Sequence, residues 1–127
     1  MGMVVLLHHT HPKVRWYDRQ ADWSFYRSQV AGTVHVVFPK WLGVLLYNIM
    51  DHTAHHVDPK IPLYRLPESQ RAIESLFVED VIVTRFRLAD ALRICRQCRL
   101  YDFRRRRWLD WHGSPTSEPD FKPSCPN

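Results

Sequence analysis

The sequence predicts a mainly α-helical chain of short helices joined by long proline-rich loops, with one short strand. Apolar residues recur at helical spacing in several short segments, and only one segment, near residue 82, has the β-branched run of a strand. Nine prolines against four glycines interrupt the helical patterns repeatedly. The 127 residues suit one domain with a small core of its own.

The first element is the apolar segment MGMVVLL, which runs directly into histidines without a capping residue. It therefore looks like the last turns of a longer helix. Residues 11–18 contain Pro12 and mixed aromatic and charged residues, a pattern typical of an extended surface loop. The following stretch, ADWSFYRSQVAGTV, predicts a helix with Asp22 as its N-cap, because Trp23, Tyr26 and Val30 share a face.

The clearest predicted helix covers residues 39–56. Pro39 suits its first turn, and Leu45, Asn48 and His52 continue a helical repeat with no later glycine or proline to interrupt it. Prolines then exclude a helix until Glu68. The remaining expected elements are a helix over 68–77, a strand over 80–87, a helix over 88–98 and a disordered tail over 114–127 that follows a domain of residues 1–113.

The net charge of +5 suits an anionic partner: nucleic acid, lipid headgroups or an acidic protein. The run RRRR at 104–107 lies among aromatic residues, as in some nucleic-acid sites, but a basic stretch beside a membrane is the simpler interpretation, and we expect no nucleic acid. Spanning a bilayer takes about 20 apolar residues, and no segment has them. The three cysteines, Cys95, Cys98 and Cys125, are odd in number and indicate a reducing environment rather than a disulfide framework.

Six of the eight histidines lie in two clusters, HHTHP at 8–12 and HTAHH at 52–56. Spacings of three and four place His52, His55 and His56 on one side of a helix, where neutral imidazoles can bind a metal. A solvated histidine patch or a favourable charge at the helix end would explain the triplet equally well. The spacing is not that of a zinc finger, and an all-imidazole site suggests redox iron. We expect a structural role for His35.

Two stretches carry a resemblance. HTHPKVRWYDRQADWSF, followed by GTV and then NIMDHTAHH, resembles the C-terminal half of membrane fatty acid desaturases of the acyl-lipid omega-6 (delta-12) type. In that family H-T-H-P follows the last transmembrane helix and precedes the third histidine box, H-x-x-H-H. PLYRLPESQRAIE and RLYDFRRRRWLDWHG resemble the cytosolic C-terminal region of bacterial members, so the likeness extends over residues 5–113.

The resemblance implies a di-iron centre that activates O₂ and desaturates an acyl-lipid substrate in a membrane, with electrons from ferredoxin or cytochrome b5. It places this segment on the cytosolic face. The implied iron ligands are His9, His11, His52, His55 and His56, with Asn48 and Asp51 as supporting partners.

Two departures from the family weaken the implied activity. The first two histidine boxes and the membrane helices are missing from the sequence, and Tyr47 stands where close relatives are expected to have histidine. We therefore expect a fragment, with Met1 inside the last membrane helix or at the start of a broken gene, that is inactive alone. The alternatives are a fragment of a related di-iron hydroxylase or ketolase, or a non-catalytic basic fragment that binds lipid or metal.

Overall fold

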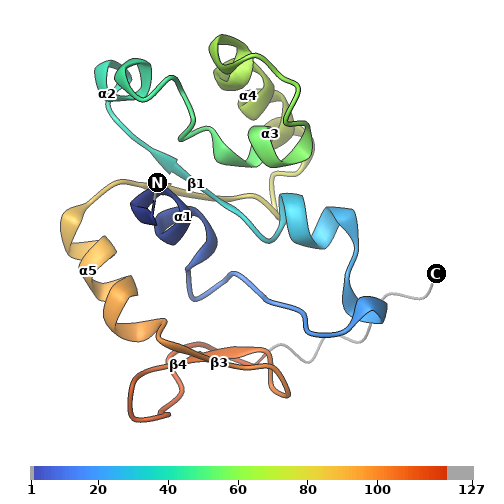
Figure 1. Cartoon of the computed structure of the whole chain (residues 1–127), viewed down its shortest axis with the longest axis vertical. Helices are drawn as coiled ribbons and strands as arrows, with labels where there is room; N and C mark the ends of the chain where they lie inside the picture. The colour runs from blue at the N-terminus through green and yellow to red at the C-terminus, as the bar shows by residue number, and fades with distance from the viewer. Residues whose placement is uncertain (1, 120–127) are drawn as a thin grey trace.

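The computed structural model describes residues 2–119 of the chain. Figure 1 shows strand β1 crossing the middle of the molecule, with α2, α3 and α4 on one side of it and the β3–β4 hairpin at the opposite end. The elements in order are α1 (Gly2–His9), the 3₁₀ turn η1 (Gln20–Asp22), the π-helical turn η2 (Tyr26–Val30), β1 (Val34–Val37), α2 (Lys40–Leu45), α3 (His52–Val57), η3 (Leu63–Arg65), α4 (Leu66–Leu76), β2 (Ile82–Arg85), α5 (Leu88–Gln97), β3 (Leu100–Asp102) and β4 (Arg107–Leu109).

Two small sheets organise the fold. Strand β1 pairs in parallel with β2, Val34 opposite Ile82, and β3 pairs antiparallel with β4. Helices prevail, as predicted, and β2 lies within the predicted strand, but the expectation of one strand is wrong. The missed strand β1 buries Val34 and Val36 while the alternate residues are less buried, a two-residue period too short to stand out in the sequence.

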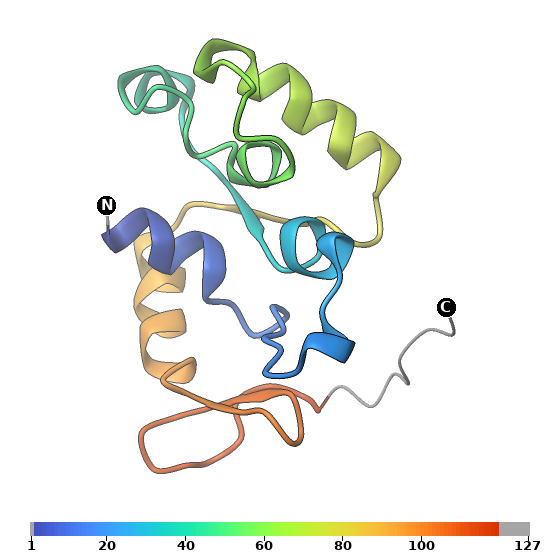
Figure 2. The same cartoon turned by 45° about the vertical axis from the view of Figure 1, so that its right-hand side comes forward.

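The buried apolar residues form two clusters, one on each side of β1. The first joins η2, α3 and α4 through Val30, Ala54, Leu66 and Ile73. The second joins α1 to β1, with Leu7 and Val14 packed against Val34 and Val36. Figure 2, a second view of the same ribbon, also shows α1 lying beside β1. This packing brings the end of α1 close to α3.

The predicted helix over 39–56 is wrong as a single helix. It is divided into α2 and α3 by Tyr47 and Asn48, which both adopt left-handed backbone angles, φ 54° and φ 57°. Such angles are disfavoured for residues with a Cβ, and asparagine tolerates them better than tyrosine does. No glycine or proline marks the break, which is why the sequence pattern did not predict it.

The predicted N-cap at Asp22 is also wrong. Asp22 lies in η1 and pairs with Arg106, 2.8 Å away, while the helical turn that follows begins near Phe25. The Ser24 hydroxyl accepts the Arg27 N–H at 3.2 Å there. At the far end of the turn, Gly32 is required, because a Cβ at this position would lie 2.5 Å from the Ser28 carbonyl oxygen.

The C-terminal elements follow the prediction more closely. Helix α5 matches residues 88–98, and α4 begins two residues before the predicted start, with Pro67 in its first turn. Ordered contacts extend past the predicted boundary at 114, since Thr116 donates its N–H to the Trp108 carbonyl and its hydroxyl to the Gln97 carbonyl. The rest of the predicted tail, residues 120–127, lies outside the described residues.

Candidate metal centre

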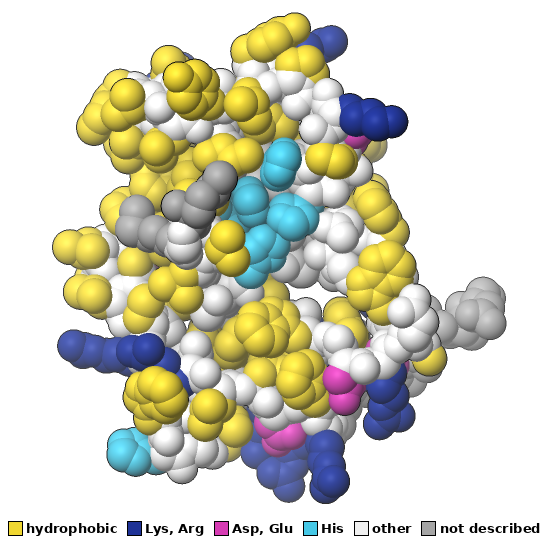
Figure 3. Space-filling view, viewed as in Figure 1, with side chains coloured by type: hydrophobic (Ala, Val, Ile, Leu, Met, Phe, Trp, Pro, Cys, Tyr) yellow, Lys and Arg dark blue, Asp and Glu magenta, His cyan; other side chains and the backbone are white. Residues whose placement is uncertain are grey.

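Two helices far apart in the sequence bring four histidines together. Helix α1 ends with His8 and His9, and α3 carries His52 and His56. Figure 3 shows histidine side chains gathered at the middle of one face, with hydrophobic side chains around them. We call His8, His9, His52 and His56 the histidine cluster.

Three of these imidazoles converge closely. The Nε2 atom of His52 lies 3.1 Å from Nε2 of His9 and 3.1 Å from Nε2 of His56. One nitrogen from each ring lies within 4.8 Å of the other two, a separation that suits three ligands of one metal ion. His8 packs against His52 with ring centroids 4.5 Å apart.

The hydrogen bonds on the outer side of the rings decide where the protons lie. Nδ1 of His52 contacts the Ile49 carbonyl oxygen at 3.3 Å, and Nδ1 of His56 contacts Oε1 of Gln29 at 2.8 Å. These oxygens only accept hydrogen bonds, so both Nδ1 atoms carry the proton and both Nε2 atoms present lone pairs. This is the orientation that metal-binding histidines adopt when an outer partner fixes the tautomer.

Protonation does not relieve the crowding of these lone pairs. Burial, together with the neighbouring histidines, lowers the pKa of His52 to about 3, and burial lowers the pKa of His56 to about 4. The rings are therefore neutral near pH 7. If Nε2 of His9 carries a proton, it can donate that proton to Nε2 of His52. The contact between Nε2 of His52 and Nε2 of His56 still joins two lone pairs. A bound cation would satisfy them all, so these residues fit a metal ion.

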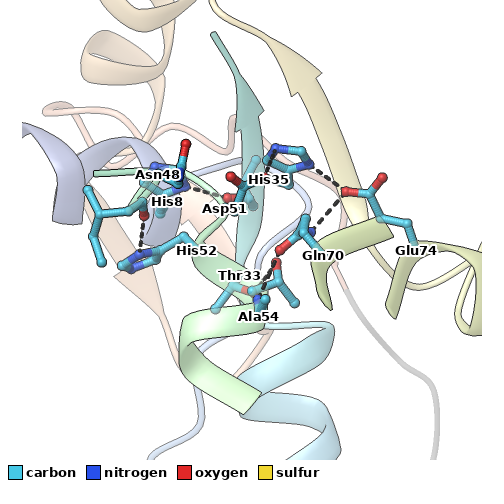
Figure 4. Close-up of polar contacts among 12 residues, drawn as sticks. His8, Thr33, His35, Asn48, Asp51, His52, Ala54, Gln70 and Glu74 are labelled. Atoms are coloured by element: carbon cyan, nitrogen blue, oxygen red, sulfur yellow. Dashed lines mark hydrogen bonds and ion pairs between the residues drawn. The ribbon is translucent and has the colours of Figure 1, made fainter. Parts of the chain in front are cut away.

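Neighbouring elements hold α3 in place by polar contacts (Figure 4). The fully buried hydroxyls of Thr33 and Thr53 hydrogen-bond at 2.9 Å. Helix α3 lacks a side-chain cap from its own N-terminal residue, and Oε1 of Gln70 on α4 accepts the free Ala54 N–H at 2.9 Å. The histidine-bearing helix is thus capped from another helix, which fixes its position relative to β1 and α4.

His35 on β1 completes this supporting network, in agreement with the expected structural role. Its Nδ1 contacts Oε1 of Glu74 at 2.5 Å, and its Nε2 lies 3.4 Å from Oδ1 of Asp51. The same Glu74 oxygen accepts the Gln70 side-chain N–H at 2.9 Å. Burial raises the pKa of Asp51, whereas His35 lowers it. The network links β1, the residue before α3, and α4.

The structure brings together only three of the five predicted metal ligands. His9, His52 and His56 meet, whereas the backbone turns at His11, whose ring lies near Lys13 and Arg93. The ring of His55 lies 5.9 Å from that of His52, and its buried Nδ1 has no hydrogen-bond partner within residues 2–119. The ligand roles of all five stay predictions.

The two predicted supporting residues do not touch the cluster by any polar side-chain contact found in the described part of the chain. Asp51 contacts His35, and the Asn48 side chain donates to the Leu63 carbonyl at 3.3 Å. Sequence reasoning missed His8 and Gln29. His8 could have been noticed as one more imidazole in HHTHP, but nothing in the sequence marks Gln29.

Other predicted features lie away from the cluster. Arg106 and Arg107 are engaged with Asp22 and Asp102, which leaves Arg104 and Arg105 as the exposed part of the basic run. Cys95 and Cys98 are both free thiols, and Cys125 lies outside the described residues. Among the helices that the structure describes, none has the length and apolar character needed to cross a membrane.

Comparison with known proteins agrees with the histidine pattern. The chain is 35% identical over 102 residues to the sn-1 oleoyl-lipid 12-desaturase of Picosynechococcus sp., and 33% identical over the same length to the enzyme of that name from Synechocystis sp.. The chain is homologous to the acyl-lipid omega-6/delta-12 fatty acid desaturases. The chloroplastic omega-6 fatty acid desaturase of Spinacia oleracea is a more distant relative at 28% identity.

The matches to these desaturases include 80% of this chain but only 29%, 29% and 23% of the three relatives. The chain therefore spans less than a third of the length of the relatives that it matches. No family model matches it.

Proposed function

We propose that this chain is the iron-binding C-terminal segment of an O₂-dependent acyl-lipid desaturase, and that it introduces a cis double bond only together with the segments that supply further ligands. The observation that carries this proposal is the convergence of His9, His52 and His56, with Nε2 contacts of 3.1 Å, in a homologue of desaturases. When bound, iron would supply the activation of O₂ needed to remove two hydrogens from an unactivated acyl chain.

The chain's own residues would bind the metal ion and hold the imidazole rings in the orientation that binding requires. Gln29 and the Ile49 carbonyl hold the protons of His56 and His52 on the outer side of the rings, so that Nε2 is available to the metal. Thr33 and Gln70 fix α3, and His35 ties it to α4 through Asp51 and Glu74. Preorganised ligands of this kind need little rearrangement when iron binds.

The surroundings of the cluster support a lipid substrate. A depression of about 320 Å³ borders His9 and is lined by aromatic side chains that include Trp16, Trp23 and Phe103. On α2, Trp41 and Val44 are both 69% exposed, which suits contact with a membrane surface. Arg104 and Arg105 are available to anionic lipid on the cytosolic face or to an acidic donor such as ferredoxin or cytochrome b5.

The test uses a longer desaturase that contains this segment. Replacing His52 with alanine should abolish the unsaturated product, measured by gas chromatography of membrane lipids, while His112→Ala, a change in an exposed histidine outside the cluster, should leave it at the wild-type level. The 127-residue chain supplied alone with iron, O₂ and reduced ferredoxin should show no turnover. Wild-type product from His52→Ala would overturn the assignment. A hydroxylated or keto product from the unmodified parent would point instead to the related oxygenases.

The non-catalytic alternative has one supporting observation, which is that three nitrogens can bind a metal without any reaction. It predicts that a parent protein carrying His52→Ala loses metal but that the unmodified parent makes no product. Measuring iron content beside product in the same preparations separates the two functions.

A further inference from the structure

The ring of His8 is the most buried of the histidine cluster. His8 is 0% exposed, and its Nδ1 contacts the Val34 carbonyl oxygen at 2.5 Å. Its Nε2 is buried, and within residues 2–119 no atom hydrogen-bonds to it. The ring packs on that of His52 with centroids 4.5 Å apart.

The Val34 contact determines which nitrogen carries the proton. A backbone carbonyl can only accept, so the hydrogen lies on Nδ1, and Nε2 keeps its lone pair. Removing such a lone pair from water without replacing its hydrogen bond is costly, and native proteins rarely leave a buried polar atom in this state.

The arrangement of His8 repeats that of His52 and His56. In all three residues Nδ1 contacts an oxygen that only accepts, which leaves Nε2 as the free nitrogen, and the His8 ring lies directly against one of the other two. The oxygen that fixes His8 belongs to β1, the strand that also carries His35, so the sheet itself sets this ring's orientation.

We propose that His8 donates its Nε2 lone pair to a metal ion bound by the histidine cluster, as a nitrogen ligand beside His9, His52 and His56. This inference rests on the proposed metal centre and adds a ligand that the third histidine box and the H-T-H-P motif do not contain. The Val34 carbonyl acts as the outer partner that holds the ring and its tautomer. A buried water bonded to Nε2 is the alternative, and it predicts no response of this atom to metal.

The first experiment follows the ring nitrogens of the 127-residue chain by nuclear magnetic resonance, with ¹⁵N-labelled histidine and Zn²⁺ as a diamagnetic probe. We expect the Nε2 signals of His8, His9, His52 and His56 to shift together at stoichiometric metal, while those of His112 stay unchanged. If the other three respond and His8 does not, the inference is wrong and the metal centre stands. If none responds, both are wrong.

The second experiment measures Co²⁺ affinity by competition with a chromophoric chelator. His8→Gln, which nearly keeps the side-chain volume, should weaken binding by at least about 10- to 100-fold, the loss that removal of an outer partner of a metal ligand already causes. His112→Gln is the matched control and should bind as the wild type does. Circular dichroism establishes that each variant is folded. A folded His8→Gln variant with unchanged affinity would overturn the inference, and the resonance experiment on the wild-type chain decides the question if the variant does not fold.

Discussion

Helices α2 and α3 follow one another in the chain and have the same length, but their surroundings differ. The apolar side chains of α2 face outward, with Trp41, Val44 and Leu45 between 66% and 69% exposed. In α3, His52, Thr53 and Ala54 are all buried, and this turn is held by hydrogen bonds to Thr33, which directly precedes β1, and to Gln70 on α4. The more polar helix is thus the one in the interior, because its polar groups find partners there. Three substitutions test this contrast.

Of these three substitutions, the largest effect is expected from Gln70→Ala, which removes the cap that α4 provides to α3. Gln70 is 1% exposed, and the change leaves the buried Ala54 N–H without an acceptor. We expect the free energy of unfolding, measured by urea denaturation, to fall by about 1–3 kcal/mol. Gln20→Ala, an exposed glutamine in η1, is the control and should change it little. Equal losses from the two variants would show that α3 is not held in this way.

A smaller effect of opposite sign is expected at the junction of the two helices. Tyr47 is 73% exposed and adopts a φ of 54°, so glycine removes backbone strain while losing little buried area. Tyr47→Gly should raise the free energy of unfolding by about 1 kcal/mol. Tyr64→Gly is the matched control, because Tyr64 is 78% exposed in η3 without a positive φ, and it should lower the value. Destabilisation by both changes would indicate that α2 and α3 form one continuous helix in solution.

The smallest effect is expected within α2 itself. Trp41→Ala removes a side chain that is 69% exposed, so thermal or urea denaturation in aqueous buffer should shift by no more than about 0.5 kcal/mol. Ile73→Ala, in the core cluster beneath α3, should cost about 2–5 kcal/mol. A loss at Trp41 as large as that at Ile73 would mean that α2 is packed against the rest of the chain, and the contrast with α3 would no longer hold.

The sequence by itself determined the features that depend on neighbours along the chain. The spacing of His52 and His56 puts them on one side of a helical turn, whatever surrounds it, and both rings meet there at 3.1 Å. The β-branched run of β2 and the helical repeat of α5 are equally local, and both elements form where they were expected. The homology to acyl-lipid desaturases also follows from sequence alone.

Tertiary structure decided which histidines join those on α3. His9 meets them and His11 does not, because α1 ends at His9 and the backbone turns at His11. The same packing of α1 against β1 buries His8 and gives it Val34 as a partner. The His8–Val34 contact joins residues that are 26 positions apart in the chain, and the His9–His52 contact joins residues that are 43 positions apart. Such contacts depend on how the two core clusters pack around β1, and no repeat along the chain encodes them.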